Sequence, residues 1–461
     1  MKYVSTRNNQ KEFSFKEVFI KGLADDGGLF IPKTLKHFSN EELNQLKNLN
    51  YTDLSVKILH PFCSDFINED DLKKIVEKSY SKFRIEDVVK ITNLGPHKLL
   101  ELFHGPTLAF KDIAMQFIGN LYEYYLKQNN GFINIVVATS GDTGAAAIDA
   151  IKSKKNMNIF VLHPNNKISK VQRKLMTTVK DKNVFNIAIN GNFDDCQNLV
   201  KSMFADLKFS NSIKMSGVNS INWARIIAQS VYYFFAYFKI NGDKKINFSV
   251  PTGNFGDVYA GYLSKNMGLP IDKLLVATNQ NDILFRAISS GDYSANEVKE
   301  SISPSMDIQV ASNFERLIYD LLSKDSNKTN DVMKNFKKNK KFLIDTDLLN
   351  KLKKDFISEK IDENETINEI KSNFENYNII LDPHTAIGVG AVNKLNLKDE
   401  FIILSTAHPC KFPDATNQAI NKMENLPNEL NYILNEKENF EIIDNSSEKI
   451  KTYIKKKINL N

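Results

Sequence analysis

The sequence predicts an α/β protein built on mainly parallel sheets covered by helices, with a helical domain at its N-terminus. Three observations support this class. From about residue 86, short and nearly all-apolar runs recur, each with the length of a strand buried on both faces. Helical patterns separate most of these runs, and such alternation indicates parallel strands. The first 85 residues carry helix-period segments instead and lack the alternation.

The N-terminal segment is predicted to hold helices around Phe15–Leu23, Glu41–Leu49 and Leu72–Phe83. A turn at residues 25–28 leads into Leu29–Pro32. We therefore assign residues 1–85 to a helical domain and residues 86–461 to a second domain with two α/β subdomains and a C-terminal extension. The role of the first domain is open, and closing over an active site is one hypothesis.

The predicted buried strands of the second domain are Ile133–Ala138, Ile159–Leu162, Ile246–Val250, Leu274–Ala277, Ile379–Leu381 and Phe401–Leu404. Residues Asn183–Ile189 alternate between apolar and polar side chains, which is typical of an edge strand. The region from about 290 to 375 is rich in charged and amide side chains. It predicts exposed helices joined by polar loops.

Composition narrows the class of protein further. The 461 residues suffice for two or three domains, and 42% hydrophobic with 25% charged residues is ordinary for a soluble protein. The net charge of +6 comes from 61 basic and 55 acidic side chains, both spread along the chain. We therefore interpret the Lys-rich stretch at 337–341 as a solvated face and expect no nucleic-acid partner.

The number of cysteines and the hydropathy of the chain indicate in which cellular compartment the protein is expected. The three cysteines, Cys63, Cys196 and Cys410, are odd in number and widely spaced, so we expect neither a disulfide framework nor a metal site. The first residues are polar and contain no apolar signal segment. The apolar stretch Ile226–Phe238 is too short and interrupted to cross a bilayer, and it predicts a buried helix. These features favour a cytoplasmic protein without membrane contact.

Residues 251–257, with the sequence PTGNFGD, form a predicted loop that we call the glycine loop. It follows the strand Ile246–Val250 and precedes a helical pattern at Val258–Asn266. Glycine lets a backbone approach a ligand closely, and a helix start favours anions. The spacing is neither GxGxxG nor that of a P-loop, so the anion need not belong to a nucleotide. An ordinary tight turn is the alternative interpretation.

Residues 139–144, with the sequence TSGDTG, form a second such loop, which we call the hydroxyl loop. It connects the strand Ile133–Ala138 to the helical pattern Ala145–Ile151. Its two kinds of hydroxyl side chain and its helix start are suited to a carboxylate. The alternative is a helix capped by Ser, Asp or Thr, and the residues by themselves leave both interpretations open.

Lys111 stands at the start of a predicted helix, Ile113–Leu126, just after a Gly-Pro turn. Helical spacing places it on the apolar face with Ala114, Met115, Ile118, Tyr122 and Tyr125. The predicted polar face consists of Asp112, Gln116, Asn120 and Glu123. Burial disfavours a charged ammonium group, and a neutral amine is a nucleophile suited to a Schiff base. The alternative is a lysine whose stem is buried while its amine reaches water.

These pieces together resemble the fold type II enzymes that depend on pyridoxal 5′-phosphate (PLP), the tryptophan synthase β family, and in detail the threonine synthase family. FHGPTLAFKD at 103–112 resembles the Schiff-base segment, ATSGDTGAAA at 138–147 the substrate-carboxylate loop, and PTGNFGD the cofactor-phosphate loop. STAHPCKFPD at 405–414 resembles the segment that faces the pyridine nitrogen. STR at 5–7, GLADDGGLFIP at 22–32 and NSINWAR at 219–225 are also similar to family stretches.

The resemblance implies roles for particular residues. Lys111 would hold PLP and move protons at the substrate Cα and Cβ atoms. Asp142 would face the cofactor ring, and Thr406 would hydrogen-bond its nitrogen. The cofactor phosphate would be bound mainly by backbone N–H groups of Gly253, Asn254, Phe255, Gly256 and Asp257. The substrate residues would be Ser140 and Thr143 for the carboxylate and Arg225, Lys411 and Asn222 for the phosphate. A structural ion pair is the alternative for Arg225.

The implied reaction converts O-phospho-L-homoserine and water into L-threonine and phosphate, the last step of threonine biosynthesis, in a monomer or homodimer. One alternative within the same fold is a phospholyase or dehydratase that releases a 2-oxo acid. Another is a protein that only binds PLP, a phosphosugar or a nucleotide. The intact Lys111 argues against inert PLP binding. A nucleotide site needs an acidic residue about 20 positions after the loop, and Asp272 precedes its strand instead.

Overall fold

The computed structural model of the chain describes residues 1–240 and 244–458. The chain forms two compact units, each built from two separate stretches of sequence. The first unit comprises Met1–His104 and Ser220–Glu424, and the second comprises Gly105–Asn219 and the C-terminal segment from Asn425. The predicted division into 1–85 and 86–461 is a different partition and stays a prediction. In the structure, the first 85 residues belong to the first unit.

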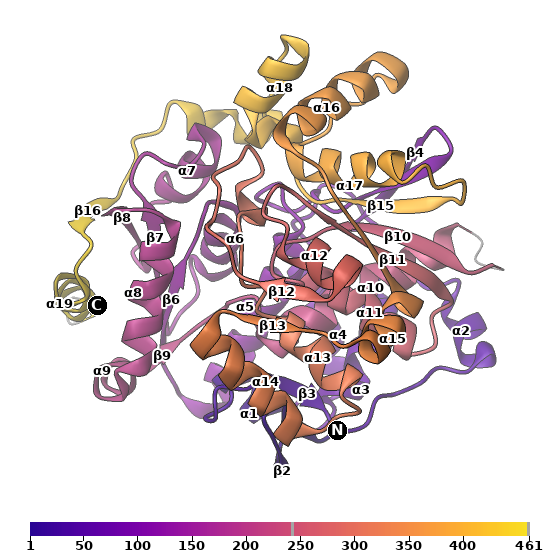
Figure 1. Cartoon of the computed structure of the whole chain (residues 1–461). Helices are drawn as coiled ribbons and strands as arrows, with labels where there is room; N and C mark the ends of the chain where they lie inside the picture. Colours follow the sequence, from indigo (N-terminus) through magenta and orange to yellow (C-terminus); the bar gives the residue numbers. More distant parts are fainter. Residues whose placement is uncertain (241–243, 459–461) are drawn as a thin grey trace. The chain divides into compact units, whose positions relative to one another are not determined.

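The first unit is organised around a six-stranded sheet with the order β14-β11-β10-β15-β5-β4. All neighbours pair in parallel except β4, which runs antiparallel to β5 at the edge. Helices α16 (Glu363–Tyr377) and α17 (Pro383–Lys394) cover one face of this sheet (Figure 1). Helices α10 (Trp223–Lys239) and α11 (Gly256–Asn266) cover the other. The strands are β4 (Lys90–Leu94), β5 (His97–Glu101), β10 (Ile246–Pro251), β11 (Ile271–Thr278), β14 (Phe356–Lys360) and β15 (Phe401–Ser405).

The N-terminal part of the first unit contains the three predicted helices. It also contains helix α3 (Tyr51–Cys63) and a small antiparallel sheet of order β2-β1-β3, which the sequence did not predict. Two of its strands have three residues each, too few to display a period. The elements are β1 (Tyr3–Ser5), β2 (Asn8–Phe13), α1 (Phe15–Lys21), β3 (Phe30–Pro32), α2 (Asn40–Leu46), α3 (Tyr51–Cys63) and α4 (Glu69–Tyr80).

The remaining helices of the first unit follow the N-terminal part along the chain. Helix α10 is buried along its length, as predicted, and no helix within the described residues is long and apolar enough to cross a membrane. The helices are α10 (Trp223–Lys239), α11 (Gly256–Asn266), α12 (Ile283–Ser290), α13 (Phe314–Leu321), α14 (Ser326–Asn339), α15 (Thr346–Asp355), α16 (Glu363–Tyr377), α17 (Pro383–Lys394) and α18 (Pro413–Ile420), with short turns η1 (Pro304–Met306) and η2 (Pro409–Lys411). Strands β12 (Asp292–Ser294) and β13 (Lys341–Leu343) form a ribbon.

The second unit is an all-parallel sheet of order β16-β8-β7-β6-β9. The C-terminal helix α19 lies against α8 on one side of this sheet, as Figure 1 shows in yellow and magenta. The strands are β6 (Ile133–Ala138), β7 (Met157–Pro164), β8 (Val184–Asn190), β9 (Met215–Ser216) and β16 (Glu441–Asp444). The helices are α5 (Lys111–Asn129), α6 (Asp142–Ile151), α7 (Lys170–Thr177), α8 (Phe193–Ala205), α9 (Leu207–Ser212), η3 (Asn428–Leu434) and α19 (Ser447–Ile458).

Two strand predictions are wrong. Ile379–Leu381 is not a strand; it is a short connection between Asn378, the left-handed C-cap of α16, and Asp382, the N-cap of α17. Its apolar side chains pack into the core from a loop. The segment Asn183–Ile189 does form a strand, β8, but not at an edge, because β16 from the C-terminal extension pairs with it. Local alternation could not reveal a partner more than 250 residues away.

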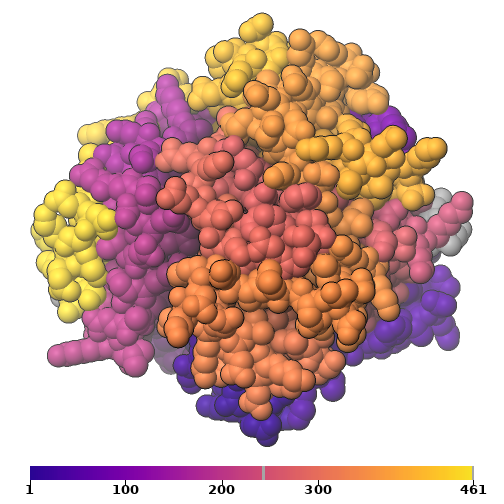
Figure 2. All heavy atoms as spheres, viewed as in Figure 1, coloured from indigo at the N-terminus to yellow at the C-terminus, as the bar shows by residue number. Residues whose placement is uncertain are grey.

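Two predictions about helix faces need correction. Most of the expected polar face of α5 is buried, because Asp112, Gln116 and Asn120 all lie inside the second unit. Their hydrogen-bond partners are the buried Thr107 and the half-buried Asp149 and Lys154, respectively. In the region from 290 to 375, α14 to α16 are partly exposed as predicted, but most of α13 is buried. In Figure 2 this region supplies the salmon and orange surface of the first unit.

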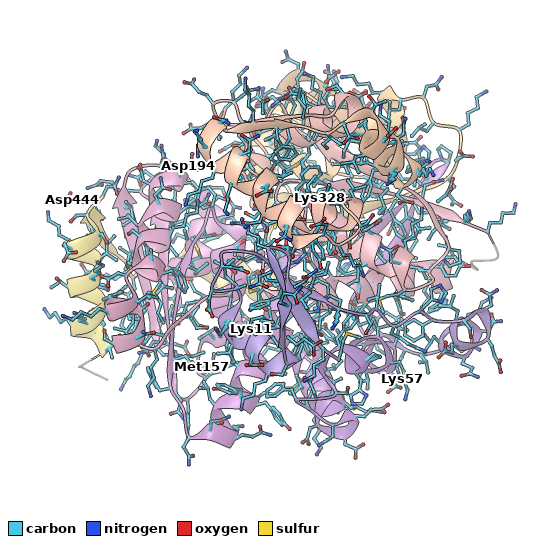
Figure 3. The ribbon with its side chains drawn as sticks, turned by 60° about the horizontal axis from the view of Figure 1, so that its bottom comes forward. Lys11, Lys57, Met157, Asp194, Lys328 and Asp444 are labelled. Atoms are coloured by element: carbon cyan, nitrogen blue, oxygen red, sulfur yellow. The ribbon has the colours of Figure 1, made fainter. Side chains whose placement is uncertain are left out.

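The surface carries charges of both signs, as the composition predicted. Lys337, Lys338, Lys340 and Lys341 are all exposed. Figure 3 labels further exposed charges, among them Lys57 and Lys328 in the first unit and Asp194 and Asp444 in the second. The three cysteines are buried free thiols, which agrees with the prediction of no disulfide.

Candidate active site

Lys111 is the first residue of helix α5 and is held there by a tight turn. Leu108 adopts a left-handed conformation with φ of 62°, which reverses the chain just before the helix. The carboxylate of Asp112 accepts hydrogen bonds from the backbone N–H of Thr107 at 2.8 Å and from its hydroxyl at 2.6 Å. Because Asp112 is fully buried, these bonds fix the entry to the helix and the direction of the neighbouring lysine.

The amine of Lys111 is buried, as the helical period predicted. The residue is 8% exposed, and its Nζ atom lies 3.4 Å from Oδ2 of Asp142 and 5.4 Å from the centre of the Phe110 ring. Gln172 donates a hydrogen bond of 2.8 Å to the other carboxylate oxygen of Asp142. Gln172 therefore sets the orientation of the carboxylate beside the lysine, a role that sequence analysis missed.

The hydroxyl loop is shaped by Thr139, which precedes the residues singled out from sequence. Its Oγ1 atom accepts hydrogen bonds from the backbone N–H groups of Gly141 at 2.9 Å and Gly144 at 2.8 Å. Gly141 has φ of 134°, a conformation that favours glycine, and it is the N-cap of α6 without a side-chain cap. Thr139 thus satisfies an N–H group in the first turn of α6, as the threonine of the capping alternative would, although the N-cap position Gly141 itself has no side-chain cap. Both interpretations of the loop therefore stay open.

Ser140 and Thr143 lie in the hydroxyl loop with partly exposed side chains. Within the described part of the chain, neither hydroxyl makes a hydrogen bond, so both can receive an external acceptor or donor. The first N–H groups of α6 also lack partners inside the helix. This arrangement suits a carboxylate, and the assignment to the substrate stays a prediction.

The glycine loop connects β10 to α11 in the first unit. Phe255 is the N-cap of α11 and has φ of 63°, although it is not glycine. Its buried ring is clamped by Phe314 and Phe356, at 5.2 Å and 5.8 Å between ring centres. Such a backbone conformation costs free energy and persists only where the surroundings enforce it. The aromatic packing thus holds the start of α11 open toward an anion.

Gly253 is the tightest position of the glycine loop. A Cβ atom there would lie 2.7 Å from the carbonyl oxygen of Ser305 and 3.3 Å from Cα of Met306, both backbone atoms. The loop therefore requires glycine at this position for close packing against η1 and not for a positive φ. Glycine in this loop was expected to let a ligand approach the backbone closely, and the structure shows that the Ser305 and Met306 backbone also requires glycine at this position.

The side chain of Asp257 points away from the loop, into the interior of the first unit. Its Oδ1 atom accepts hydrogen bonds from the hydroxyls of Tyr232 and Tyr233 on α10. Burial raises the pKa of this carboxyl to about 6, although the two tyrosines and Arg225 act in the opposite direction. Asp257 thus ties α11 to α10, which leaves its backbone N–H for the predicted anion.

Asp257→Asn is expected to remove a pH dependence from stability. The carboxyl has a folded pKa of about 6, against about 3.9 in an unfolded chain. The folded state therefore binds the proton more tightly, so the contribution of Asp257 to stability is largest below pH 4 and declines as the pH rises through 6. The difference in unfolding free energy between wild type and variant should shift by about 2 kcal/mol between pH 4 and pH 7.

Urea unfolding of the cofactor-free proteins at four pH values measures this shift. Asp272→Asn, at an exposed carboxyl of the same unit, is the control. Parallel pH profiles for wild type and Asp257→Asn would contradict the assignment.

Thr406 follows the last residue of β15, and a buried network fixes its backbone. The Thr406 N–H donates to Oγ1 of Thr385 at 3.1 Å, and the Thr385 hydroxyl donates to the carboxylate of Asp382. Asp382 also binds Nδ1 of His384 at 2.9 Å, while Nε2 of His384 accepts from the Ser305 N–H at 3.3 Å. His384 is therefore the neutral tautomer with its proton on Nδ1.

The residues at the N-terminus of α17 consequently hold the backbone at two positions. Through Thr385 they hold the backbone of Thr406, and through His384 they hold Ser305, the wall beside Gly253. Within the described chain the Thr406 hydroxyl itself makes no hydrogen bond, so it can bind a ring nitrogen. Asp382, His384 and Thr385 were not singled out from sequence.

Thr385→Val is expected to lower the free energy of unfolding by about 2 kcal/mol, because the buried Thr406 N–H loses its acceptor. Thr385→Ser keeps the hydroxyl and should lose much less. Urea unfolding of the cofactor-free protein measures both, and equilibrium titration with PLP should show weaker binding to the valine variant only. Equal stability of the two variants would mean that the hydroxyl is unimportant.

The predicted substrate-phosphate residues are all buried in the first unit. Asn222 caps α10, where its Oδ1 accepts from the Ala224 N–H and its Nδ2 donates to the Phe19 carbonyl at 3.0 Å. Burial lowers the pKa of Arg225 to about 10, and Asp257 and Tyr232 oppose the shift. Lys411 ends η2 and is fully buried. Asn222 thus has a structural task, and the roles of all three toward a substrate stay predictions.

His104 lies near Lys111 in sequence, where a histidine can act as a base or have a purely structural role. Its Nε2 atom lies 2.9 Å from Oε2 of Glu101, in the first unit. This contact agrees with the structural interpretation.

In each unit, groups that can bind a ligand thus lie at the carboxyl ends of parallel strands. The second unit supplies a buried primary amine and the hydroxyl loop, and the first supplies an anion-binding helix start and the Thr406 hydroxyl. These groups fit PLP, whose aldehyde takes an amine, whose phosphate takes N–H groups and whose ring nitrogen takes a hydrogen-bond partner. The fold and these groups together define a PLP-dependent enzyme of fold type II.

Comparison with known proteins agrees with this class. The family model described as "Pyridoxal-phosphate dependent enzyme" matches residues 98–333. The models "Threonine synthase N terminus" and "Threonine synthase, C-terminal" match residues 2–80 and 385–454. The chain belongs to the threonine synthase family of PLP-dependent lyases.

The similarity extends over the whole chain. The threonine synthase of Pseudomonas aeruginosa is 42% identical over 459 residues and covers 98% of each chain. That of Saccharomyces cerevisiae is 43% identical over 96% of this chain and 95% of its own. The crystal structure of PLP-bound threonine synthase from Brucella melitensis superimposes with a TM-score of 0.95 at 42% identity, covering 99% of both chains.

Proposed function

We propose that this protein converts O-phospho-L-homoserine and water into L-threonine and phosphate, with Lys111 as its catalytic residue. The observation that carries the proposal is the buried amine of Lys111 beside the oriented carboxylate of Asp142. The amine of a lysine in such a place is already removed from water and is held in one orientation. Both properties suit a residue that binds a carbonyl carbon and transfers protons. Membership of the threonine synthase family supports the choice of substrate.

When bound, PLP supplies an electron sink that stabilises negative charge on substrate carbon atoms. The amine of Lys111 holds and moves protons at Cα and Cβ of the substrate. Asp142 orients that amine and faces the cofactor ring. Backbone N–H groups of the glycine loop, from Gly253 to Asp257, bind the cofactor phosphate, and the Thr406 hydroxyl binds the ring nitrogen.

The substrate is recognised through its two anionic ends. Ser140 and Thr143, with the N–H groups at the start of α6, bind the carboxylate. Arg225 and Lys411 supply positive charge for the phosphate, with Asn222 as a neutral donor.

The decisive experiment incubates purified protein with PLP and O-phospho-L-homoserine and quantifies threonine, 2-oxobutyrate and phosphate in the same samples. Threonine and phosphate in equal amounts, both lost in Lys111→Ala, are the expected result. Phosphate with 2-oxobutyrate would make the protein a phospholyase of the same fold. Folded, PLP-loaded protein that releases no phosphate would refute the substrate assignment.

The proposal includes a small-molecule substrate, no nucleic-acid or membrane partner, a cytoplasmic location, and a monomeric or homodimeric state. Sedimentation of the purified protein, with and without PLP, distinguishes the two oligomeric states. Fractionation of cells that produce the chain tests its location.

A further inference from the structure

Several family-like stretches have no part in the chemistry described above. They are STR at 5–7, the end of GLADDGGLFIP near Phe30, and the beginning of NSINWAR at 220–221. All three converge on one place in the first unit, the start of helix α13. That place also contacts the glycine loop, and it was not singled out from sequence.

Asn313, the N-cap of α13, binds the glycine loop directly. Its backbone N–H donates to the Asn254 carbonyl at 3.1 Å, and its Nδ2 atom donates to the same carbonyl at 3.0 Å. Nδ2 also donates to the Ser220 carbonyl at 3.2 Å. Asn313 is fully buried, so this doubly held carbonyl fixes the backbone immediately before Phe255.

Arg316, one turn further along, connects Asn313 to two more segments. Its guanidinium donates to Oδ1 of Asn313, to the Phe30 carbonyl at 3.0 Å and to the Ile221 carbonyl at 2.7 Å. It also lies over the Trp223 ring, 5.3 Å from the ring centre. The residue is completely buried, and burial lowers its pKa to about 10. A planar fork of donors can satisfy three separate acceptors at once, which the ammonium group of a lysine cannot do in this geometry.

Glu315, which precedes Arg316 in α13, binds two residues of the N-terminal segment. Arg7 binds its two carboxylate oxygens at 2.9 Å and 2.7 Å, and the Thr6 hydroxyl donates to Oε1 at 2.6 Å. The Thr6 hydroxyl also accepts from the Leu29 N–H at 2.9 Å. The Glu315 side chain is only 4% exposed and is shielded from solvent, whereas the side chain of Arg7 is 22% exposed.

We propose that Asn313, Glu315 and Arg316 form a positioning node through which the N-terminal segment fixes the conformation of the glycine loop. The inference rests on the proposed function, because it gives the N-terminal segment a role in holding the cofactor phosphate site. None of the three residues is a catalytic residue. The node supports the strained Phe255 conformation from behind, since Asn313 holds the preceding carbonyl and Phe314 packs on the Phe255 ring.

The node predicts that a change in the N-terminal segment loosens the glycine loop, even though the two are far apart in sequence. Asn313→Asp keeps the acceptor for Arg316 but replaces the donor that faces the carbonyls of Asn254 and Ser220. Thr6→Val keeps the shape of the side chain and removes both of its hydrogen bonds. Thr329→Val is the matched control, because Thr329 is equally buried in the same unit and its hydroxyl bonds only within its own helix start.

Amide hydrogen exchange of the cofactor-free proteins is the primary measurement, and it is followed in a peptide spanning residues 251–258. Exchange in this peptide should be about tenfold faster in Asn313→Asp and about threefold faster in Thr6→Val, and unchanged in Thr329→Val. Because no PLP is present, repulsion between the new carboxylate and the cofactor phosphate does not enter. Equilibrium titration should then show PLP binding weakened by similar factors.

Unchanged exchange of the glycine loop in folded Asn313→Asp and Thr6→Val would overturn the proposal. If Asn313→Asp does not fold, the comparison of Thr6→Val with Thr329→Val tests the proposal by itself. Equal acceleration in Thr329→Val would also overturn it, because the effect would then reflect general destabilisation. If the two variants show faster exchange in the glycine loop but the wild-type protein binds no PLP, the node is supported and the proposed function is refuted.

Discussion

Lys111→Ala is expected to lower kcat by about 10³-fold or more, which corresponds to about 4 kcal/mol of transition-state stabilisation. The side-chain amine of Lys111 is buried at the start of α5 and is directed at the carboxylate of Asp142. Alanine removes both its nucleophilic nitrogen and its capacity to transfer protons. Rates of threonine and phosphate formation measure the loss, and the visible absorption of the bound cofactor should change with it.

Two further substitutions separate chemistry from charge and from folding. Lys111→Arg keeps a positive charge beside Asp142 but has no neutral amine, so it should be as inactive as alanine. Lys127→Ala removes an exposed lysine from the same helix and should leave turnover unchanged. Activity of Lys111→Arg within tenfold of wild type would show that charge, and not nucleophilicity, is what position 111 supplies.

Gly253→Ala is expected to weaken PLP binding by about 100-fold, close to 3 kcal/mol. The new Cβ atom would meet the Ser305 carbonyl oxygen at 2.7 Å. Ser305 cannot move away freely, because its N–H is bound to His384 and His384 is bound to Asp382. The glycine loop must shift instead, which displaces the N–H groups that receive the phosphate. Titration of cofactor-free protein with PLP measures the change.

Gly256→Ala in the same loop is the matched control. A Cβ atom there would meet only the side-chain nitrogen of Asn313 at 3.3 Å and other atoms at 3.8 Å, so the loss should be several-fold smaller. Gly390→Ala in α17 meets ordinary contacts from 3.4 Å outward and should leave PLP binding unaffected. An equal loss for Gly253→Ala and Gly256→Ala would mean that the Ser305 wall is not what limits position 253.

Some of the site was predictable because the signal is local. The burial of Lys111 followed from helical spacing over about four turns, and α5 begins at that residue. The glycine loop and the hydroxyl loop were located from a buried strand followed by glycines and a helix. The structure places both loops between the predicted elements, β10 with α11 and β6 with α6. The resemblance then supplied the cofactor, which no spacing rule identified.

Other parts depend on partners far away in sequence. Thr6 and Glu315 are separated by 309 positions, and Asn222 and Phe19 by 203. In the sequence, Asn313 is an ordinary candidate for a helix cap, and only the fold brings the Asn254 carbonyl to its side-chain amide. The strand β8 looks like an edge until β16 pairs with it. Ile379–Leu381 resembles a strand in composition, but the two helix caps on either side leave it as a connection.

By itself, the sequence determined where buried strands turn into helices and that Lys111 lies on a buried face of its helix, because hydrophobic period and turn chemistry act over a few residues. Only the tertiary structure decided how the site is held: Gln172 on Asp142, Thr385 on Thr406, and Asn313 on the glycine loop. Buried polar groups need partners, and the fold alone determines which polar groups are brought within hydrogen-bonding distance.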